Sequence, residues 1–293
     1  MKLSGSARFS RGENFFMVWN YAFLAFLSCL TFYPIFHVLL ASFSSNSLLI
    51  QHTGLLLAPK GFSTAAYDRV FKNPMIVLGY RNTLFILIAG VVLALFMTSL
   101  AAYFLSRKNV YFKKPIMLAI TFTMFFSGGM IPTYLNLRDL GLTNNHWGLI
   151  LPGMISVYNM IILRTSFNSI PESLTEAAII DGADHIQILF RIILPLSKAI
   201  MAVMILYYGL NIWNSWFWAS AILRRRELFP LQVVLREILL QNSALEMAGG
   251  DQEAISETIK YATIIIATVP ILMVYPFLQK YFARGVMIGA VKE

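Results

Sequence analysis

The side chains best suited to chemistry in this sequence are carboxylates between residues 172 and 184. The chain has only 14 Asp and Glu among 293 residues, and four of them fall in this interval: Glu172, Glu176, Asp181 and Asp184. Carboxylates act as general acids and bases, bind metal ions, or contact basic groups on a partner. No nucleophile motif and no metal-ligand spacing accompanies them, so we predict neither catalytic nor metal-binding residues. A solvated acidic edge on a surface hairpin is the plainest interpretation.

Nucleotide chemistry is also missing from the chain. The phosphate-binding loop pattern G-x-x-x-x-G-K-[ST] is absent, and Gly249-Gly250 precedes Asp251-Gln252 without the lysine. The single cysteine, Cys29, lies in an apolar run and has no partner for an intrachain disulfide. We therefore predict that the chain is not an enzyme and needs no cofactor of its own.

The composition is that of a multi-pass membrane protein. Hydrophobic residues make up 58% of the chain and charged residues 13%, about half the share of soluble domains. The net charge of +9 does not indicate nucleic-acid binding, because the basic residues form no long run and lie mostly at the ends of apolar segments. Apolar segments of about 20 residues cross a bilayer as helices. We predict an all-α fold of one domain, residues 1–293, with six transmembrane helices near 16–42, 83–106, 115–136, 147–168, 197–222 and 261–282.

The basic residues also predict the orientation. The connection after the second span, "SRKNVYFKK", holds four basic residues and no acidic one. Such connections stay in the cytoplasm. Six spans then place both termini in the cytoplasm, together with the connection 169–195 that carries the carboxylates. Connections 43–82 and 223–260 lie outside and are expected to be ordered loops with short helices.

Within 169–195 the local signals predict two helices separated by a turn. Ser169 and Glu172 fit a capping box, so a helix is expected to begin near Ile170. Asp181-Gly182 interrupts it, since glycine adopts the positive φ of a sharp turn. A second, amphipathic helix follows, and Pro195 ends or kinks it. Its apolar stripe has helical spacing and comprises Ile186, Leu189, Phe190, Ile193 and Leu194.

The same loop resembles the cytoplasmic signature of the membrane subunits of ABC importers. The pattern E-A-A-x-x-x-G is present as Glu176-Ala177-Ala178 and Gly182, and Leu194-Pro195 follows at the family's distance. The form "EAAIIDGA…F…ILPL", with "GGMIPTYLNLRDLGLTNNHWGLILPG" and "NSWFWASAIL", is similar to the carbohydrate-uptake branch of maltose-permease type. It is most similar to the subgroup for polysaccharide-derived oligosaccharides such as aldouronate or alginate fragments.

This resemblance implies a type I ABC importer permease fold in a bacterial inner membrane. The partners that it implies are a homologous second permease, two ABC ATPase subunits that bind ATP and Mg, an extracytoplasmic solute-binding protein, membrane lipid, and an oligosaccharide, acidic or neutral. The loop 169–195 would dock on an ATPase and couple its closure to the spans. The residues assigned to this ATPase coupling are Glu172, Glu176, Ala177, Ala178, Asp181, Gly182, Ala183, Leu194 and Pro195.

A substrate path is expected along the fifth span. Tyr207, Asn211, Asn214 and Trp218 share one helical face, where amides would bind hydroxyl groups and aromatic rings would stack on sugars. Packing is the alternative, and Trp is also enriched at membrane interfaces. Tyr158 and Asn159 on the fourth span join this set, with interhelical hydrogen bonding as the rival. Arg224-Arg225-Arg226, outside, contacts lipid headgroups or the loop, or else attracts a binding protein or an anionic substrate.

Two other classes of function remain alternatives: an ion-coupled secondary transporter and a membrane scaffold without transport. The first needs ionisable residues within the spans, and only His37 and Arg164 qualify. His37 is more simply a packed residue, and Arg164 lies near the inner end of its span, where it can reach the interface. Neither alternative explains the signature in 169–195.

Overall fold

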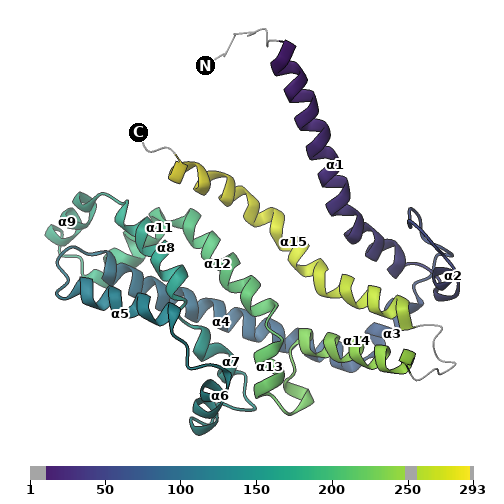
Figure 1. Cartoon of the computed structure of the whole chain (residues 1–293). Helices are drawn as coiled ribbons and strands as arrows, with labels where there is room; N and C mark the ends of the chain where they lie inside the picture. The colour runs from purple at the N-terminus through teal and green to yellow at the C-terminus, as the bar shows by residue number, and fades with distance from the viewer. Residues whose placement is uncertain (1–10, 248–255, 291–293) are drawn as a thin grey trace. The chain divides into compact units, whose positions relative to one another are not determined.

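The computed structural model describes residues 11–247 and 256–290, and this part of the chain is helical with no strand. The predicted all-α class is therefore confirmed. The elements are α1 (Arg11–Ser42), α2 (Asn46–Ile50), α3 (Ala65–Lys72), α4 (Pro74–Ser106), α5 (Lys113–Phe125), α6 (Met130–Asp139), α7 (Trp147–Ile150), η1 (Leu151–Gly153), α8 (Val157–Asn168), α9 (Glu172–Ile180), α10 (His185–Ile188), η2 (Leu189–Ile193), α11 (Leu194–Leu196), α12 (Lys198–Trp213), α13 (Phe217–Ile222), η3 (Arg226–Leu228), α14 (Leu231–Met247) and α15 (Ser256–Ala290) (Figure 1).

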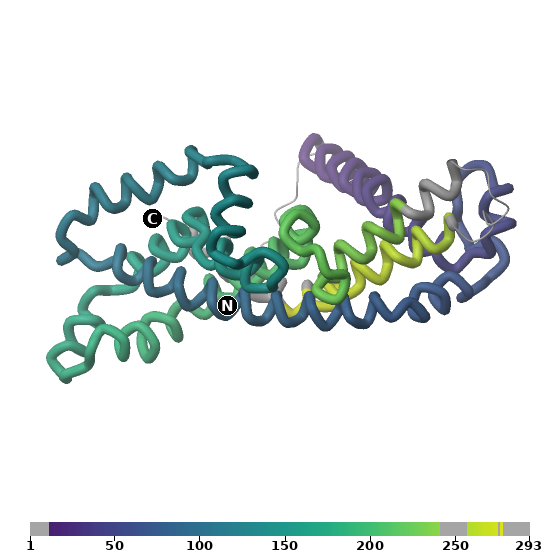
Figure 2. The backbone as a smooth tube through the Cα atoms, turned by 90° about the horizontal axis from the view of Figure 1, so that it is seen from below, coloured from purple at the N-terminus to yellow at the C-terminus, as the bar shows by residue number. Residues whose placement is uncertain are grey.

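The chain divides into two compact units. The first contains residues 1–70 and 241–265, and the second contains residues 71–240 and 266–293. In the first unit, Ala41, Leu49 and Leu56 form a small apolar core against Tyr261. The second unit is built around α4, which packs against both α8 and α12 (Figures 1 and 2). All coupling and substrate residues predicted from the sequence belong to this second unit.

Helix α4 is long because its sequence favours a clean start and contains no interruption. The side chain of Asn73 accepts a hydrogen bond from the Met75 backbone N–H at 3.0 Å, and Pro74 occupies the first turn, where its missing N–H costs nothing. The helix then runs for 33 residues. It begins nine residues before the predicted start at residue 83. Gly90 brings it close to α12, since a Cβ there would lie 2.8 Å from the Ile212 Cδ1 atom.

Three of the six expected spans are unbroken helices, and the other three are bent pairs. Apolar helices long enough to cross a membrane occupy residues 12–42, 74–106 and 257–274. The remaining segments pass the same test only as pairs, bent by 111° between α5 and α6, 47° between η1 and α8, and 89° between α11 and α12. The expectation of a continuous helix over 115–136 and over 147–168 was therefore wrong. The helix expected over 197–222 begins near the third bend and is interrupted later, at 214–216.

Local sequence explains each break. Ser127-Gly128-Gly129 separates α5 from α6, and Gly129 has a φ of +88° that favours glycine. Pro152-Gly153 precedes the second break, after which Ser156 caps α8. Pro195, with no N–H, precedes the third. Helix α12 ends at Trp213, so the segment 214–216 separates it from α13.

Candidate functional site

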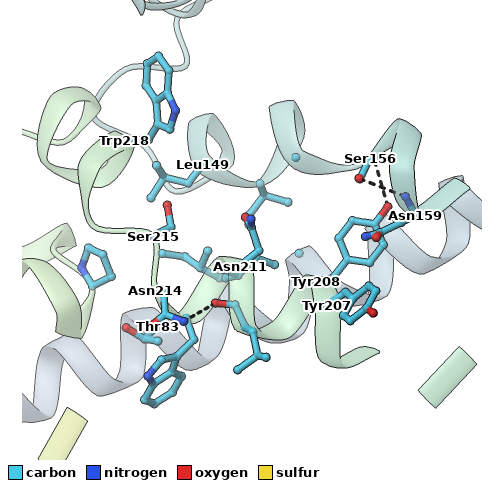
Figure 3. A pocket seen from close by; sticks show the side chains of 18 of the residues that line it. Thr83, Leu149, Ser156, Asn159, Tyr207, Tyr208, Asn211, Asn214, Ser215 and Trp218 are labelled. Atoms are coloured by element: carbon cyan, nitrogen blue, oxygen red, sulfur yellow. Dashed lines mark hydrogen bonds between the residues drawn. The ribbon is translucent and has the colours of Figure 1, made fainter. Parts of the chain in front are cut away.

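The second unit contains a cavity of about 920 Å³ whose wall mixes aliphatic, aromatic and polar side chains and carries no charged one. Three segments form most of it: α4, the broken pair α7–α8, and α12 with the link that follows it (Figure 3). Trp218 of α13 and Pro230 complete the wall. The residues that line it are Thr83, Ile86, Gly90, Leu149, Ile150, Gly153, Ile155, Ser156, Tyr158, Asn159, Tyr207, Tyr208, Leu210, Asn211, Ile212, Trp213, Asn214, Ser215, Trp218 and Pro230. Every predicted substrate-path residue is among them.

The predicted reason for this grouping was partly wrong. Tyr207 and Asn211 do share α12, but Asn214 is the C-cap that follows the last residue of this helix, and Trp218 belongs to α13. The Asn214 side-chain amide donates to the Leu210 carbonyl at 2.9 Å, so it is occupied by its own helix. The Asn211 amide forms no hydrogen bond within the described part of the chain and lines the cavity (Figure 3). Asn211 is therefore the better candidate for binding a hydroxyl group.

Sequence reasoning missed the residue that organises the inner wall of the cavity. The Tyr208 hydroxyl accepts a hydrogen bond from the Ser156 backbone N–H at 3.0 Å and lies 2.6 Å from the Thr98 hydroxyl. It thereby joins α12, α4 and the break before α8, and Figure 3 shows the contact with Ser156. Tyr208 is only 4% exposed. The doublet Tyr207-Tyr208 was the only available signal, and periodicity could not assign roles within it.

The second candidate site is the hairpin of α9, Asp181-Gly182 and α10, which lies at the end of the unit where α4 terminates (Figure 1). The predicted turn is confirmed, because Gly182 has a φ of +82°. The Ala183 N–H bonds the Ala178 carbonyl at 2.9 Å and closes the end of α9 around the glycine. Leu194 is half-buried and Pro195 exposed, at the far end of the second arm.

Two details of the hairpin differ from expectation. The predicted capping box is absent: the Ser169 hydroxyl donates to the Ser166 carbonyl at 2.7 Å, and α9 begins at Glu172 after Pro171. The predicted stripe is also wrong in part, because Ile186 and Phe190 are exposed. A π-helical turn over Leu189–Ile193 adds a residue to the turn and shifts the phase. The buried face is instead Ile188, Leu189 and Ile193.

The four carboxylates divide into two pairs. Asp184 caps α10 by accepting from the Gln187 N–H at 2.7 Å, and Glu172 pairs with Lys108. The Glu172 carboxylate raises the pKa of the Lys108 ammonium, first through their hydrogen bond and then through its charge. The side-chain carboxylates of Glu176 and Asp181 form no hydrogen bond or ion pair within the part of the chain that the structure describes, and both residues are exposed.

These free carboxylates lie on an apolar surface. Ile180 is 85% exposed, and Leu174, Ile179 and Ile186 are also exposed around the hairpin. Ala177 and Gly182 are exposed, and their small size leaves the backbone accessible at these positions. Ala178 is buried and Ala183 is half-buried. An exposed apolar surface with two unpaired acidic groups fits contact with a basic protein surface.

The other singled-out residues have local partners. The Tyr33 hydroxyl and the His37 Nδ1 atom are 3.5 Å apart, and the His37 ring packs edge-on against Tyr261. Arg164 donates to the Leu105 carbonyl at 2.9 Å. The His37 contacts agree with its packing interpretation, whereas the expected reach of Arg164 to the membrane interface stays a prediction. The tract Gly249–Gln252 lies outside the described residues.

The arginine tract after α13 is mostly engaged. Arg224 donates to the Tyr134 hydroxyl at 3.2 Å, and Arg226 pairs with Glu237 at 3.3 Å. The Arg225 guanidinium has no ion pair or hydrogen bond among the described residues and is exposed. Nearby in sequence, the Arg236 guanidinium stacks on the Trp216 ring at 3.9 Å. One free cation therefore remains in the tract.

Comparison with known proteins gives consistent matches over nearly the whole chain. Residues 85–288 match the family model described as "Binding-protein-dependent transport system inner membrane component". The polygalacturonan/rhamnogalacturonan transport system permease protein YtcP of Bacillus subtilis is 39% identical over 93% of this chain and 96% of its own. Protein LplC of the same species is 40% identical over 94% and 95%. A crystal structure of a bacterial ABC transporter involved in the import of the acidic polysaccharide alginate matches with a TM-score of 0.87, at 35% identity over 94% of this chain and 100% of that chain.

The Tyr208 contacts lead to a stability prediction. Tyr208→Phe removes both hydrogen bonds and leaves the Ser156 N–H and the Thr98 hydroxyl without that partner in an apolar bundle. We expect the free energy of unfolding of the purified chain to fall by about 1–3 kcal/mol. Denaturant titration in detergent measures it. The matched control is Tyr207→Phe, because the Tyr207 hydroxyl makes no hydrogen bond within the described residues. Equal unfolding midpoints for the two variants would contradict the assignment.

Proposed function

Because the chain belongs to the family of binding-protein-dependent transport system inner membrane components, we propose that it lines the path of an oligosaccharide through an ATP-driven importer. Membership makes the chain a membrane permease subunit of an ABC importer and not its ATPase. The observation that carries the proposed path is the cavity among α4, α8 and α12. Its wall offers amide and hydroxyl groups with aromatic rings and no fixed charge, which suits sugar hydroxyls and sugar ring faces.

The partners and the orientation follow from the hairpin. We assign its outer surface, with Glu176, Asp181 and exposed Ile180, to an ATPase subunit in the cytoplasm. The basic residues between α4 and α5 lie at the same end of the unit and support a cytoplasmic location. With six spans, both termini then lie in the cytoplasm of a bacterium. A related second permease and a second ATPase complete the assembly, and an external binding protein supplies the sugar.

An acidic oligosaccharide is the substrate class that we favour. Two similar proteins have descriptions that name acidic polysaccharides: polygalacturonan/rhamnogalacturonan transport for one and alginate import for the other. The free Arg225 guanidinium on the expected outer side supports this choice, because a surface cation speeds the approach of an anionic ligand. The cavity itself does not discriminate by charge, so a neutral oligosaccharide is the alternative.

The proposal predicts which sugars stimulate ATP hydrolysis. The complex purified with its native partners should hydrolyse ATP faster with binding protein loaded with uronate-containing oligosaccharides than with neutral ones of equal length. ATPase activity in reconstituted vesicles measures this. Stimulation by neutral oligosaccharides alone would refute the acidic class and keep the importer. The absence of stimulation by any sugar would refute the oligosaccharide path.

A second prediction tests the hairpin. Gly182→Val places a β-branched residue at a φ of +82° and adds bulk to the proposed contact surface, at a backbone cost of about 1–3 kcal/mol. We expect the ATPase subunits to be lost on purification while the chain still inserts in the membrane. Gly141→Val is the matched control, since Gly141 also has a positive φ, +69°, with open space around it. Normal ATPase retention in Gly182→Val would remove the hairpin from the interface.

A third prediction tests the cavity wall. Asn211→Ala removes the free amide, and we expect the uptake rate at saturating loaded binding protein to fall by roughly three- to ten-fold, the effect of losing one hydrogen bond. Asn214→Ala should have a smaller effect, because that amide is already bonded to Leu210. Asn168→Ala, exposed at the end of α8 and away from the cavity, is the control. Unchanged uptake in both cavity variants would mean that this face serves packing only.

A further inference from the structure

The hairpin joins its neighbours along the chain through bends. On the α8 side, residues 169–171 are not helical. On the α12 side, the π-helical turn Leu189–Ile193 is followed by a bend of 89° at Ser197. The Ser197 hydroxyl is buried and has no hydrogen-bond partner. A departure from α-helical geometry within a helix often marks a hinge, so we regard the covalent connections as the less direct route from the hairpin to the cavity.

A lateral contact with the end of α4 offers a stiffer connection. Arg107 donates to the Thr175 hydroxyl on α9 at 3.0 Å. The Tyr103 hydroxyl lies 3.0 Å from the Nδ1 atom of His185 on α10. The Arg107 guanidinium also stacks over the Tyr103 ring, 4.7 Å from its centroid. Tyr103 and Arg107, which we call the α4 clamp, therefore hold both arms of the hairpin at once.

The α4 clamp is backed by a packed apolar core. Tyr103 belongs to the same buried cluster as Phe167 of α8 and as Ile188 and Leu189 of the second arm. Tyr103 is 7% exposed and Thr175 is 5% exposed. The two hydrogen bonds are only partly buried, because His185 is exposed and Arg107 half-buried, but the close-packed interior behind Tyr103 transmits displacement.

Two further cations fasten the same end of α4. Lys113 of α5 donates to the Arg107 carbonyl at 2.9 Å, and Arg164 of α8 donates to the Leu105 carbonyl at 2.9 Å. The last carbonyls of a helix lack partners within it, and cations near its C-terminus stabilise it. The end of α4 is thus joined to α5, α8 and the hairpin, whereas no comparable polar contact joins the hairpin to α12 within the described residues.

From that end, α4 runs without a break to the cavity. Thr83, Ile86 and Gly90 line the cavity from the same helix, and Thr83 is about 30 Å from Tyr103 at the rise of an α-helix. We propose that Tyr103 and Arg107 are positioning residues that make the hairpin and α4 move as one body. A displacement of the hairpin then reaches the cavity through α4, to which the Thr98–Tyr208 contact also joins α12. This inference rests on the proposed importer function.

The test separates coupling from folding and from assembly. Tyr103→Phe keeps the ring under the guanidinium and removes only the hydrogen bond to His185. In proteoliposomes with the full importer, we expect the number of sugars imported per ATP hydrolysed to fall by about five-fold, within the range for one hydrogen bond, with ATPase retention and membrane abundance unchanged. A merely structural defect would lower uptake and hydrolysis in proportion. Tyr111→Phe, the same change at an exposed tyrosine in the next connection, should match the wild type.

Two further variants complete the design. Arg107→Lys keeps the charge but loses the planar fork that reaches Thr175 while stacking, so it should uncouple similarly and carries the test if Tyr103→Phe does not accumulate. The double variant His185→Ala/Tyr103→Phe should lower the sugar-to-ATP ratio no further than either single variant, because each removes the same hydrogen bond. An unchanged sugar-to-ATP ratio in Tyr103→Phe and Arg107→Lys overturns the inference. A wild-type complex that imports no sugar would instead refute the proposed function.

Discussion

The constraint on which this structure depends is that a backbone N–H inside an apolar bundle must find a partner within the protein. An unbroken helix meets it automatically, but three of the six apolar segments are bent. At the break before α8, the Ser156 hydroxyl caps the next turn and the Tyr208 hydroxyl accepts the Ser156 N–H. That break opens the cavity, so the residues that satisfy the exposed backbone are also the residues that shape the wall. The polar groups at this site satisfy the backbone at the break first, and contact with sugar in the proposed path is their second role.

The features that could be predicted from the sequence are those determined over a few residues. Gly182 gave the hairpin turn because only a glycine tolerates its φ readily, and the result did not depend on distant contacts. The apolar segments could also be located, because local composition determines them. The stripe after the turn was wrong at Phe190, which lies inside a π-helical turn that nothing in "LFRII" signals, and at Ile186, which lies before that turn. Ser169 failed as a cap because Pro171 delays the helix and the hydroxyl bonds backwards instead.

The residues that were predicted from one continuous helix line a single cavity although that helix is broken. Asn214 and Trp218 were assigned to a continuous face that does not exist, yet both line the cavity with Tyr207 and Asn211. The link 214–216 is short, so the chain stays beside the same cavity wall after α12 ends. The directions of the side chains after the break differ from those in a continuous helix. What the break alters is the chemistry: the Asn214 amide returns to Leu210, and Asn211 keeps the free one. Tyr208 could not be found from sequence, because its role requires Thr98 and Ser156, which are distant along the chain.

The distribution of charge separates the tasks of the two ends of the second unit. At the hairpin, Glu172 and Asp184 are used for structure, and Glu176 and Asp181 stay available to a partner. At the cavity there is no charge at all. An anionic sugar that enters such a wall gains hydrogen bonds and stacking but no neutralisation, so the wall holds it weakly and releases it readily. A transport path benefits from this, because tight binding along the route would slow release. If the substrate is acidic, as we propose, its selection belongs upstream, to the binding protein and to surface cations such as Arg225, which act on the rate of encounter more than on affinity.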